Sequence, residues 1–203
     1  MSLKLQPRDR NILDALARYG VLSTNQIGDI FFNGVAHTTL MKRLRLLEKE
    51  NWLTRGATLN NAENTFSLGS KANALYPERE SNRFTNRSTI HHDVLLSSVR
   101  LRLEGLGLAK EWAPEFEIRA KALRTQWRSR DEIVIPDGLW IESIQGEFKA
   151  ITVELELTVK SRARYLEIFK RHFIFSRNTY RYFYVVNTAL DAKRIIKAAE
   201  KAE

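Results

Sequence analysis

Apolar residues near the N-terminus recur at helical spacing in three successive segments. The first segment begins at Pro7, which suits an opening helical turn, and ends at Gly20, which supplies a left-handed stop. The second covers residues 25–32 and follows residues 23–24, a serine and a threonine, either of which can cap a helix. The third covers residues 35–50. The pattern therefore predicts three consecutive helices within the first fifty residues.

The third predicted helix carries two different stripes. One stripe is apolar and contains Leu40, Leu44 and Leu47. The other is polar and basic and contains Thr38, Lys42, Arg45 and Lys49. Such a helix suits the major groove of DNA, where lysine and arginine reach guanine acceptors or phosphates and threonine contacts bases or thymine methyl groups. The alternative interpretation is a solvated surface helix.

Two short strands are predicted after the third helix, at residues 52–55 and 65–68, joined by the turn-rich residues 59–64. Three helices followed by a hairpin is the element order of a winged helix-turn-helix domain. Arg55 is then expected to contact the DNA backbone, whereas Asn60 and Asn61 are expected first as turn formers and second as DNA contacts. The complete predicted DNA-binding set is Thr38, Thr39, Lys42, Arg43, Arg45, Lys49, Arg55, Asn60 and Asn61.

The segment 77–88 is polar and charged and lacks an apolar period, so it is predicted to be an exposed linker. This divides the chain into a winged helix-turn-helix domain at 1–76 and a second domain at 89–203.

The second domain alternates predicted helices and strands. A helix at 89–105 is followed by strand-like segments, then by a helix at 161–175, a strand at 180–186 and a closing helix at 190–202. This order predicts an α/β (α+β) arrangement. The strand-like segments are 108–112, 115–118, 133–135, 138–142 and 148–157.

A set of carboxylates lies on these predicted strands. Asp137 follows Pro136 at the start of one strand, and Glu154 and Glu156 lie on the next, where alternation places both on one face. Three such carboxylates can hold Mg²⁺, which can activate water against a phosphodiester, and Lys160 can stabilise the developing charge. The alternative is a half-exposed strand whose glutamates only face solvent.

A second basic patch is predicted between the strands, because residues 119–130 contain five basic residues, one tryptophan and no acid. Basic residues of the following helix either extend this patch or form a solvated helix face. The patch residues are Arg119, Lys121, Arg124, Arg128 and Arg130, and the helix residues are Arg162, Arg164, Lys170 and Arg171.

Charge and composition narrow the function classes. The net charge of +9 over 203 residues favours a polyanionic partner, because neutralising each phosphate releases counterions. The chain contains no cysteine, which excludes disulfides, thiolate zinc sites and a cysteine nucleophile. No signal-peptide core or membrane-length apolar run is seen, so we expect a cytoplasmic protein without a membrane partner.

Several short strings, early and late in the chain, carry a resemblance to a known family. The early ones are Arg8-Asp9-Arg10-Asn11-Ile12-Leu13, the segment Leu-Ser-Thr-Asn-Gln-Ile at 22–27, and Lys42-Arg43-Leu44-Arg45-Leu46-Leu47; the later ones are His91, Pro136-Asp137-Gly138 and Glu154-Leu155-Glu156. These strings, together with the order of elements over nearly the whole chain, resemble the replication-relaxation proteins of bacterial mobile elements. The resemblance implies DNA binding near a transfer or replication origin or at a promoter, with a relaxase or another mobile-element protein as an implied partner.

The second half is also similar to the PD-(D/E)XK nuclease fold, in which an aspartate on one strand and an acid-x-lysine on the next bind metal and cut DNA. Asp137 matches the first element and Glu154 the second. Glu156 stands where that family usually has lysine, and Lys160 follows four residues later. This departure favours a domain that keeps the fold for binding or assembly.

We therefore expect a non-enzymatic, sequence-specific double-stranded DNA-binding protein that acts as a relaxosome or replication accessory factor or as a transcription regulator. DNA binding of this kind needs no cofactor, and a homodimer is expected because two half-sites give more specificity than one helix. The alternative is a Mg²⁺-dependent DNA endonuclease that uses Asp137, Glu154 and Glu156 as metal ligands and Lys160 as a catalytic partner. An RNA-binding module is disfavoured, because no aromatic pair lies on a strand in the usual RNA-platform pattern.

Overall fold

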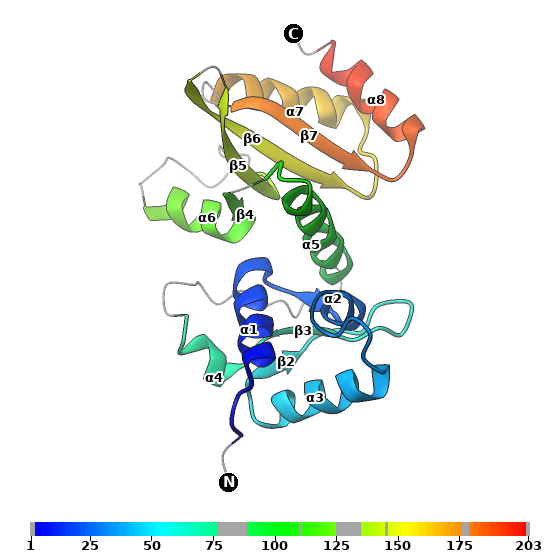
Figure 1. Cartoon of the computed structure of the whole chain (residues 1–203). Coiled ribbons are helices and arrows are strands. Elements are labelled where there is room, and N and C mark those ends of the chain that lie inside the picture. The colour runs from blue at the N-terminus through cyan, green and yellow to red at the C-terminus, as the bar shows by residue number, and fades with distance from the viewer. Residues whose placement is uncertain are drawn as a thin grey trace. The chain divides into compact units, whose positions relative to one another are not determined.

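The computed structural model describes residues 3–76, 89–109, 111–124, 135–144, 146–175 and 179–201. These residues form a mixed α and β protein with two sheets, which confirms the predicted α/β class. The chain divides into two compact units, unit 1 (Met1–Leu101) and unit 2 (Arg102–Glu203) (Figure 1). No helix within the described ranges is long and apolar enough to cross a membrane.

Unit 1 opens with the three predicted helices, α1 (Pro7–Tyr19), α2 (Thr24–Phe31) and α3 (His37–Lys49). Local signals define their ends. Gly20 ends α1 with a φ of 88°, a value that glycine adopts without strain. Ser23 caps α2 by accepting a hydrogen bond from the Gln26 backbone N–H at 3.2 Å, and the Gln26 side chain accepts one from the Ser23 N–H at 2.8 Å. The three helices are therefore confirmed to within two residues at each end.

A three-stranded antiparallel sheet completes the core of unit 1. It contains β1 (Leu22–Ser23), β2 (Leu53–Arg55) and β3 (Thr65–Leu68) in the order β1-β3-β2, and a short helix α4 (Ser70–Asn73) follows. The hairpin of β2 and β3 is the predicted one, whereas β1 and α4 were not predicted. The helices and the hairpin share one apolar core, made mainly by Ile12, Leu13, Leu16, Ile27, Leu40, Leu44, Leu47, Leu53 and Phe66.

Helix α5 (Ile90–Gly105) is the predicted helix at 89–105, and its first three turns pack on unit 1. The Ser97 hydroxyl donates to the Val21 carbonyl at 2.9 Å. The guanidinium of Arg100, which is only 5% exposed, donates to the Arg18 carbonyl at 2.5 Å near the C-terminus of α1. A cation at this position also meets the negative end of the α1 dipole.

The division into units therefore differs from the domain limits expected from the sequence, which placed all of 89–203 in the second domain. The structure groups residues 90–101 with unit 1, and the division falls inside α5. The physical reason is that the helix buries Ile90 and Val94 against Val21, so the first part of α5 belongs to a cluster of unit 1. Residues 77–88, the predicted linker, lie outside the described residues.

Unit 2 contains a four-stranded mixed sheet in the order β4-β5-β6-β7. The strands β4 to β6 pair antiparallel, and β7 pairs parallel to β6. A parallel neighbour requires a crossover, which α7 (Arg162–Phe175) provides (Figure 1). The strands are β4 (Trp112–Pro114), β5 (Gly138–Ile144), β6 (Glu147–Glu156) and β7 (Thr179–Val186), and α8 (Ala189–Ala199) closes the unit.

Aromatic side chains pack both faces of this sheet. On one face, Tyr165 and Phe169 of α7 pack with residues of α8 and with Tyr184 of β7. On the other face, Trp112 stacks on Trp140 with ring centroids 6.0 Å apart. This stacking requires a glycine at position 138, because a Cβ there would overlap the Trp112 ring.

One predicted strand is wrong. Residues 115–118 belong to α6 (Glu115–Arg124), not to a strand. The alternation Glu-Phe-Glu-Ile imitates a strand, but Pro114 precedes it and helix-forming residues follow. An ion pair between Glu115 and Arg119, one helical turn apart, also suits the helix. The strand predicted at 108–112 is replaced by β4, and residues 133 and 134 lie outside the described residues.

Candidate functional site

Helix α3 presents one apolar and one polar face, as the sequence predicts. Leu40, Leu44 and Leu47 are buried in the unit 1 core. The opposite face is exposed along about three turns and carries two threonines and three basic residues, namely Thr38, Thr39, Lys42, Arg45 and Lys49. We call these five residues the α3 basic face.

Arg43, which was also predicted as a DNA contact, does not belong to this exposed face. Its Nε donates to Asp9 Oδ1 at 2.8 Å, and its Nη2 pairs with Asp9 Oδ2. The Asp9 side chain is fully buried and the Arg43 side chain is 15% exposed. The hydrogen bond that Arg43 donates to Asp9 raises the pKa of Arg43. A bidentate pair with a buried carboxylate ties α3 to α1, so Arg43 holds the helix in place.

Arg55 lies on β2 next to the C-terminal part of α3. Its Nη2 pairs with Glu48 Oε2 at 2.7 Å, and its side chain is 38% exposed. Exposed pairs of this type contribute little to stability and exchange readily with other partners. Arg55 therefore lies beside the α3 basic face with a partly exposed guanidinium group.

The loop between β2 and β3 folds back on the start of α2. The Thr24 N–H donates to the Asn64 carbonyl at 2.9 Å, and the Asn25 N–H donates to Glu63 Oε1 at 2.7 Å. Asn61 closes a local turn by accepting from the Glu63 N–H at 3.2 Å. Asn60 is exposed. These contacts favour the turn-forming interpretation for Asn61 over the DNA-contact one.

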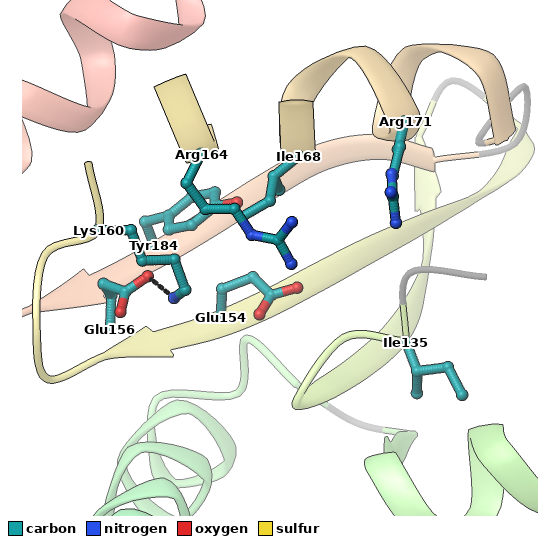
Figure 2. A pocket seen from close by; sticks show the side chains of 8 residues that line it. All are labelled: Ile135, Glu154, Glu156, Lys160, Arg164, Ile168, Arg171 and Tyr184. Carbon is teal, nitrogen blue, oxygen red and sulfur yellow. Dashed lines mark hydrogen bonds and ion pairs between the residues drawn. The ribbon is translucent and has the colours of Figure 1, made fainter. Parts of the chain in front are cut away.

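Unit 2 contains a pocket of about 240 Å³ between β6 and α7. Figure 2 shows glutamates of the strand facing arginines of the helix across it. We call it the α7 pocket, and its lining residues are Ile135, Glu154, Glu156, Lys160, Arg164, Ile168, Arg171 and Tyr184.

Two of the three predicted carboxylates line this pocket, and Asp137 is not among its lining residues. Glu154 and Glu156 both line it, which confirms that alternation places them on one face. Glu156 pairs with Lys160, while Asp137 Oδ2 accepts a hydrogen bond from the Leu155 N–H at 2.7 Å. In the part of the chain that the structure describes, no three His, Asp or Glu side chains form a group that could hold a metal ion.

Glu154 has a strongly raised pKa. Burial raises its pKa to about 8, and the neighbouring carboxylates of Asp137, Glu156 and Glu115 act in the same direction, while Lys160 opposes them. Its Oε1 is buried and has no hydrogen-bond partner among the described residues. Burial also raises the pKa of Tyr184, which lies opposite Glu154 in the strand register. A perturbed carboxyl group in a pocket is a candidate binding or proton-transfer group.

The second predicted basic patch is only partly within the described residues. Arg119 lies on α6 and pairs with Glu115, and Lys121 is exposed on the same helix. Arg124 is the last residue of α6. Arg128 and Arg130 lie outside the described residues. The structure therefore places part of this patch on a helix that was expected to be strand and loop.

In comparisons with known proteins, no family model, curated protein or solved structure matches this chain.

Arg164 and Arg171 of the α7 pocket were predicted only as a possible extension of the second basic patch, and Tyr184 and Ile135 were not predicted as site residues. The sequence offered one signal for the arginines, because positions 164 and 171 are two turns apart and share a helix face. Tyr184 and Ile135 gave no such signal, since their place depends on strand pairing across the sheet.

Proposed function

We propose that the chain is a sequence-specific double-stranded DNA-binding protein that reads DNA with the α3 basic face. The observation that carries this proposal is the exposed stripe of threonines and basic residues on a helix whose opposite face is buried in the core. A helix of this kind fits the major groove, where it presents its side chains to base edges and to both flanking backbones.

The positions on the helix suggest separate roles. Thr38, Lys42 and Arg45 are spaced by four and three residues, so they form a continuous row for base contacts. Lys49, one turn further, and Arg55, on β2, are the phosphate contacts of this proposal. The resemblance to replication-relaxation proteins supports a role as an accessory or regulatory protein of a mobile element, acting as a homodimer on paired half-sites.

The test of this proposal is a titration of a fluorescent duplex with the full chain at several salt concentrations, followed by selection of bound sequences from a random pool. Lys42→Ala/Arg45→Ala is expected to weaken binding by about 10- to 100-fold. The slope of the logarithm of the association constant against the logarithm of the salt concentration is expected to fall in magnitude by about one for each lost phosphate contact. Arg194→Ala, which removes an exposed arginine of α8, is the matched control. Unchanged binding by the double variant would refute the proposal.

A second candidate function, a metal-dependent DNA endonuclease, is favoured by one observation. Glu154 and Glu156 line the α7 pocket beside Lys160, and the carboxylate of Asp137 bonds to the backbone between the two glutamates. Glu154 and Glu156 are carboxylates of the kind that bind Mg²⁺, and the buried Oε1 of Glu154 has no hydrogen-bond partner among the described residues. Asp137 does not join them in a three-acid metal-binding group there. A bound Mg²⁺ would activate water for attack on a phosphodiester.

The two candidates are separated by incubating supercoiled and linear DNA with the protein in Mg²⁺, Mn²⁺ or EDTA. A nuclease is expected to cut only with metal and to lose cleavage in Glu154→Gln. The control is Glu147→Gln on the same strand, because the Glu147 side chain is 71% exposed. If the DNA stays uncut and only shifts on a gel, DNA binding is the remaining candidate and the nuclease is excluded.

A further inference from the structure

One flank of helix α3, beside the α3 basic face, lies against α1. Successive residues of a helix are rotated by about 100°, so Arg43 lies about 100° from Lys42, next to the exposed face but not on it. Arg43 pairs with Asp9 in the first turn of α1. The start of α1 therefore lies along this flank of α3 (Figure 1).

The other flank of α3 lies against the hairpin of β2 and β3. Glu48 follows Lys42 by six residues, a rotation of about 600°, which places it about 120° from Lys42 in the direction opposite to Arg43. Glu48 pairs with Arg55 of β2 at 2.7 Å. Arg55 and the start of α1 therefore border the α3 basic face on opposite sides.

Arg8 is an exposed cation on the α1 side of α3. It directly precedes Asp9, and its Cζ lies 4.6 Å from the centroid of the Phe32 ring. Phe32 ends α2, and its carbonyl accepts from the Val35 N–H in the turn that leads into α3. The ring contact holds the guanidinium beside this turn without neutralising its charge. Within the described part of the chain, Arg8 has no ion pair.

Lys4 is a second exposed cation in the segment that leads into α1. Its neighbours Leu3 and Leu5 both pack on the core of unit 1, whereas Lys4 is exposed. The two leucines anchor this segment, so the lysine between them is held at the surface of unit 1. Like Arg8, Lys4 forms no ion pair with any residue that the structure describes.

We propose that Lys4 and Arg8 bind the DNA backbone on one side of the major groove, while Arg55 binds the backbone on the other side. The groove is about 12 Å wide and a helix with its side chains is about 10–12 Å across, so elements along both flanks of an inserted helix lie over the two bordering strands. Cations on these flanks fix the register of the helix on the duplex without reading bases. This inference rests on DNA reading by the α3 basic face and adds two residues to it.

The test is a titration of a fluorescent duplex with the full chain at several salt concentrations. Lys4→Ala/Arg8→Ala is expected to lower the magnitude of the slope of the logarithm of the association constant against the logarithm of the salt concentration by about two, one for each lost phosphate contact. The preferred DNA sequence should stay the same, because phosphate contacts carry no base information. Lys4→Gln/Arg8→Gln removes the same charges but keeps longer side chains, and it should give the same loss.

The matched control is Arg194→Ala/Lys197→Ala, which removes one exposed arginine and one exposed lysine from α8 and should keep the slope. Neutral methylphosphonate groups, placed one at a time along each strand, then locate the contacts. In each half-site, the phosphates whose neutralisation no longer weakens binding should lie on one strand for Lys4→Ala/Arg8→Ala and on the other strand for Arg55→Ala.

An unchanged slope in both Lys4/Arg8 variants, or positions on the same strand as those of Arg55→Ala, would overturn the proposal and leave DNA reading by α3 in place. Unchanged binding by Lys42→Ala/Arg45→Ala, or a chain that binds no duplex, would overturn the DNA reading itself and this inference with it. The two failures are therefore distinguishable.

Discussion

Replacing Arg43 with alanine is expected to unfold unit 1 locally, not to remove a DNA contact. Arg43 provides the charge partner of Asp9, whose side chain is completely buried. Among the described residues, the other hydrogen bond to that carboxylate is donated by the Gln6 N–H at 2.6 Å. Breaking one partner of a buried pair leaves an uncompensated charge and costs roughly 3–5 kcal/mol. We therefore expect the free energy of unfolding of unit 1 to fall by about this amount.

The assay is amide hydrogen exchange of peptides from α1 and α3, because it reports the stability of unit 1 separately from unit 2. A loss of 3 kcal/mol corresponds to exchange that is about 10²-fold faster. Asp9→Leu/Arg43→Leu removes both charges, so it should recover most of the protection, less about 1 kcal/mol for the lost bond to Gln6. Arg45→Ala, on the exposed face, is the control and should stay within about 0.5 kcal/mol of wild type.

The reasoning fails if Arg43→Ala keeps normal exchange and yet binds DNA more weakly with a smaller salt slope. That result would return Arg43 to the DNA-reading set and assign Asp9 a different partner. We expect Arg43→Ala to bind DNA weakly and to exchange its amide hydrogens fast. Asp9→Leu/Arg43→Leu should recover both DNA binding and slow exchange.

Three further predictions concern other buried groups. Gly138→Ala should destabilise unit 2 and change its tryptophan fluorescence, because the new Cβ would overlap Trp112, whereas Gly105→Ala meets nothing within 4 Å and should be neutral. Arg100→Ala should lower the stability of unit 1 by roughly 1.5–3 kcal/mol in the exchange assay, since it removes a buried charged hydrogen bond. The pKa of Glu154 is raised in the folded state from 4.5 to about 8, so urea unfolding of unit 2 should show stability falling as pH rises through that window, by up to about 1.4 kcal/mol per pH unit, and Glu154→Gln should remove the dependence.

The helices of unit 1 could be predicted because their signals are local. Ser23 and Gly20 mark helix ends by their own chemistry, and the leucine stripe of α3 identifies its buried face without knowledge of the partner. The segment at 115–118 was mispredicted because four alternating residues fit a strand as well as the start of an amphipathic helix. The limits of unit 1 also depend on a distant contact, since only the packing of α5 on Val21 shows to which core that helix belongs.

The α7 pocket was predictable on its strand side only. The spacing of two residues places Glu154 and Glu156 on one face whatever the sheet contains. Which helix covers that face depends on the crossover between β6 and β7, so Arg164 and Arg171 were recognised as basic helix residues but not as partners of Glu154. Long-range packing, not local propensity, determines this half of the site.

The residues of α3 show how position around a helix divides basic residues between a buried ion pair and an exposed face. Successive residues are rotated by about 100°, so Lys42 and Arg45 fall on one side and Arg43, between them in sequence, falls a third of a turn away. There its side chain pairs with Asp9 of α1 and is largely buried, whereas Lys42 and Arg45 are exposed. The net charge of +9 therefore overstates the charge available to a polyanion, and the salt slope of DNA binding should follow the exposed residues of the α3 basic face and its two flanks, and not the total.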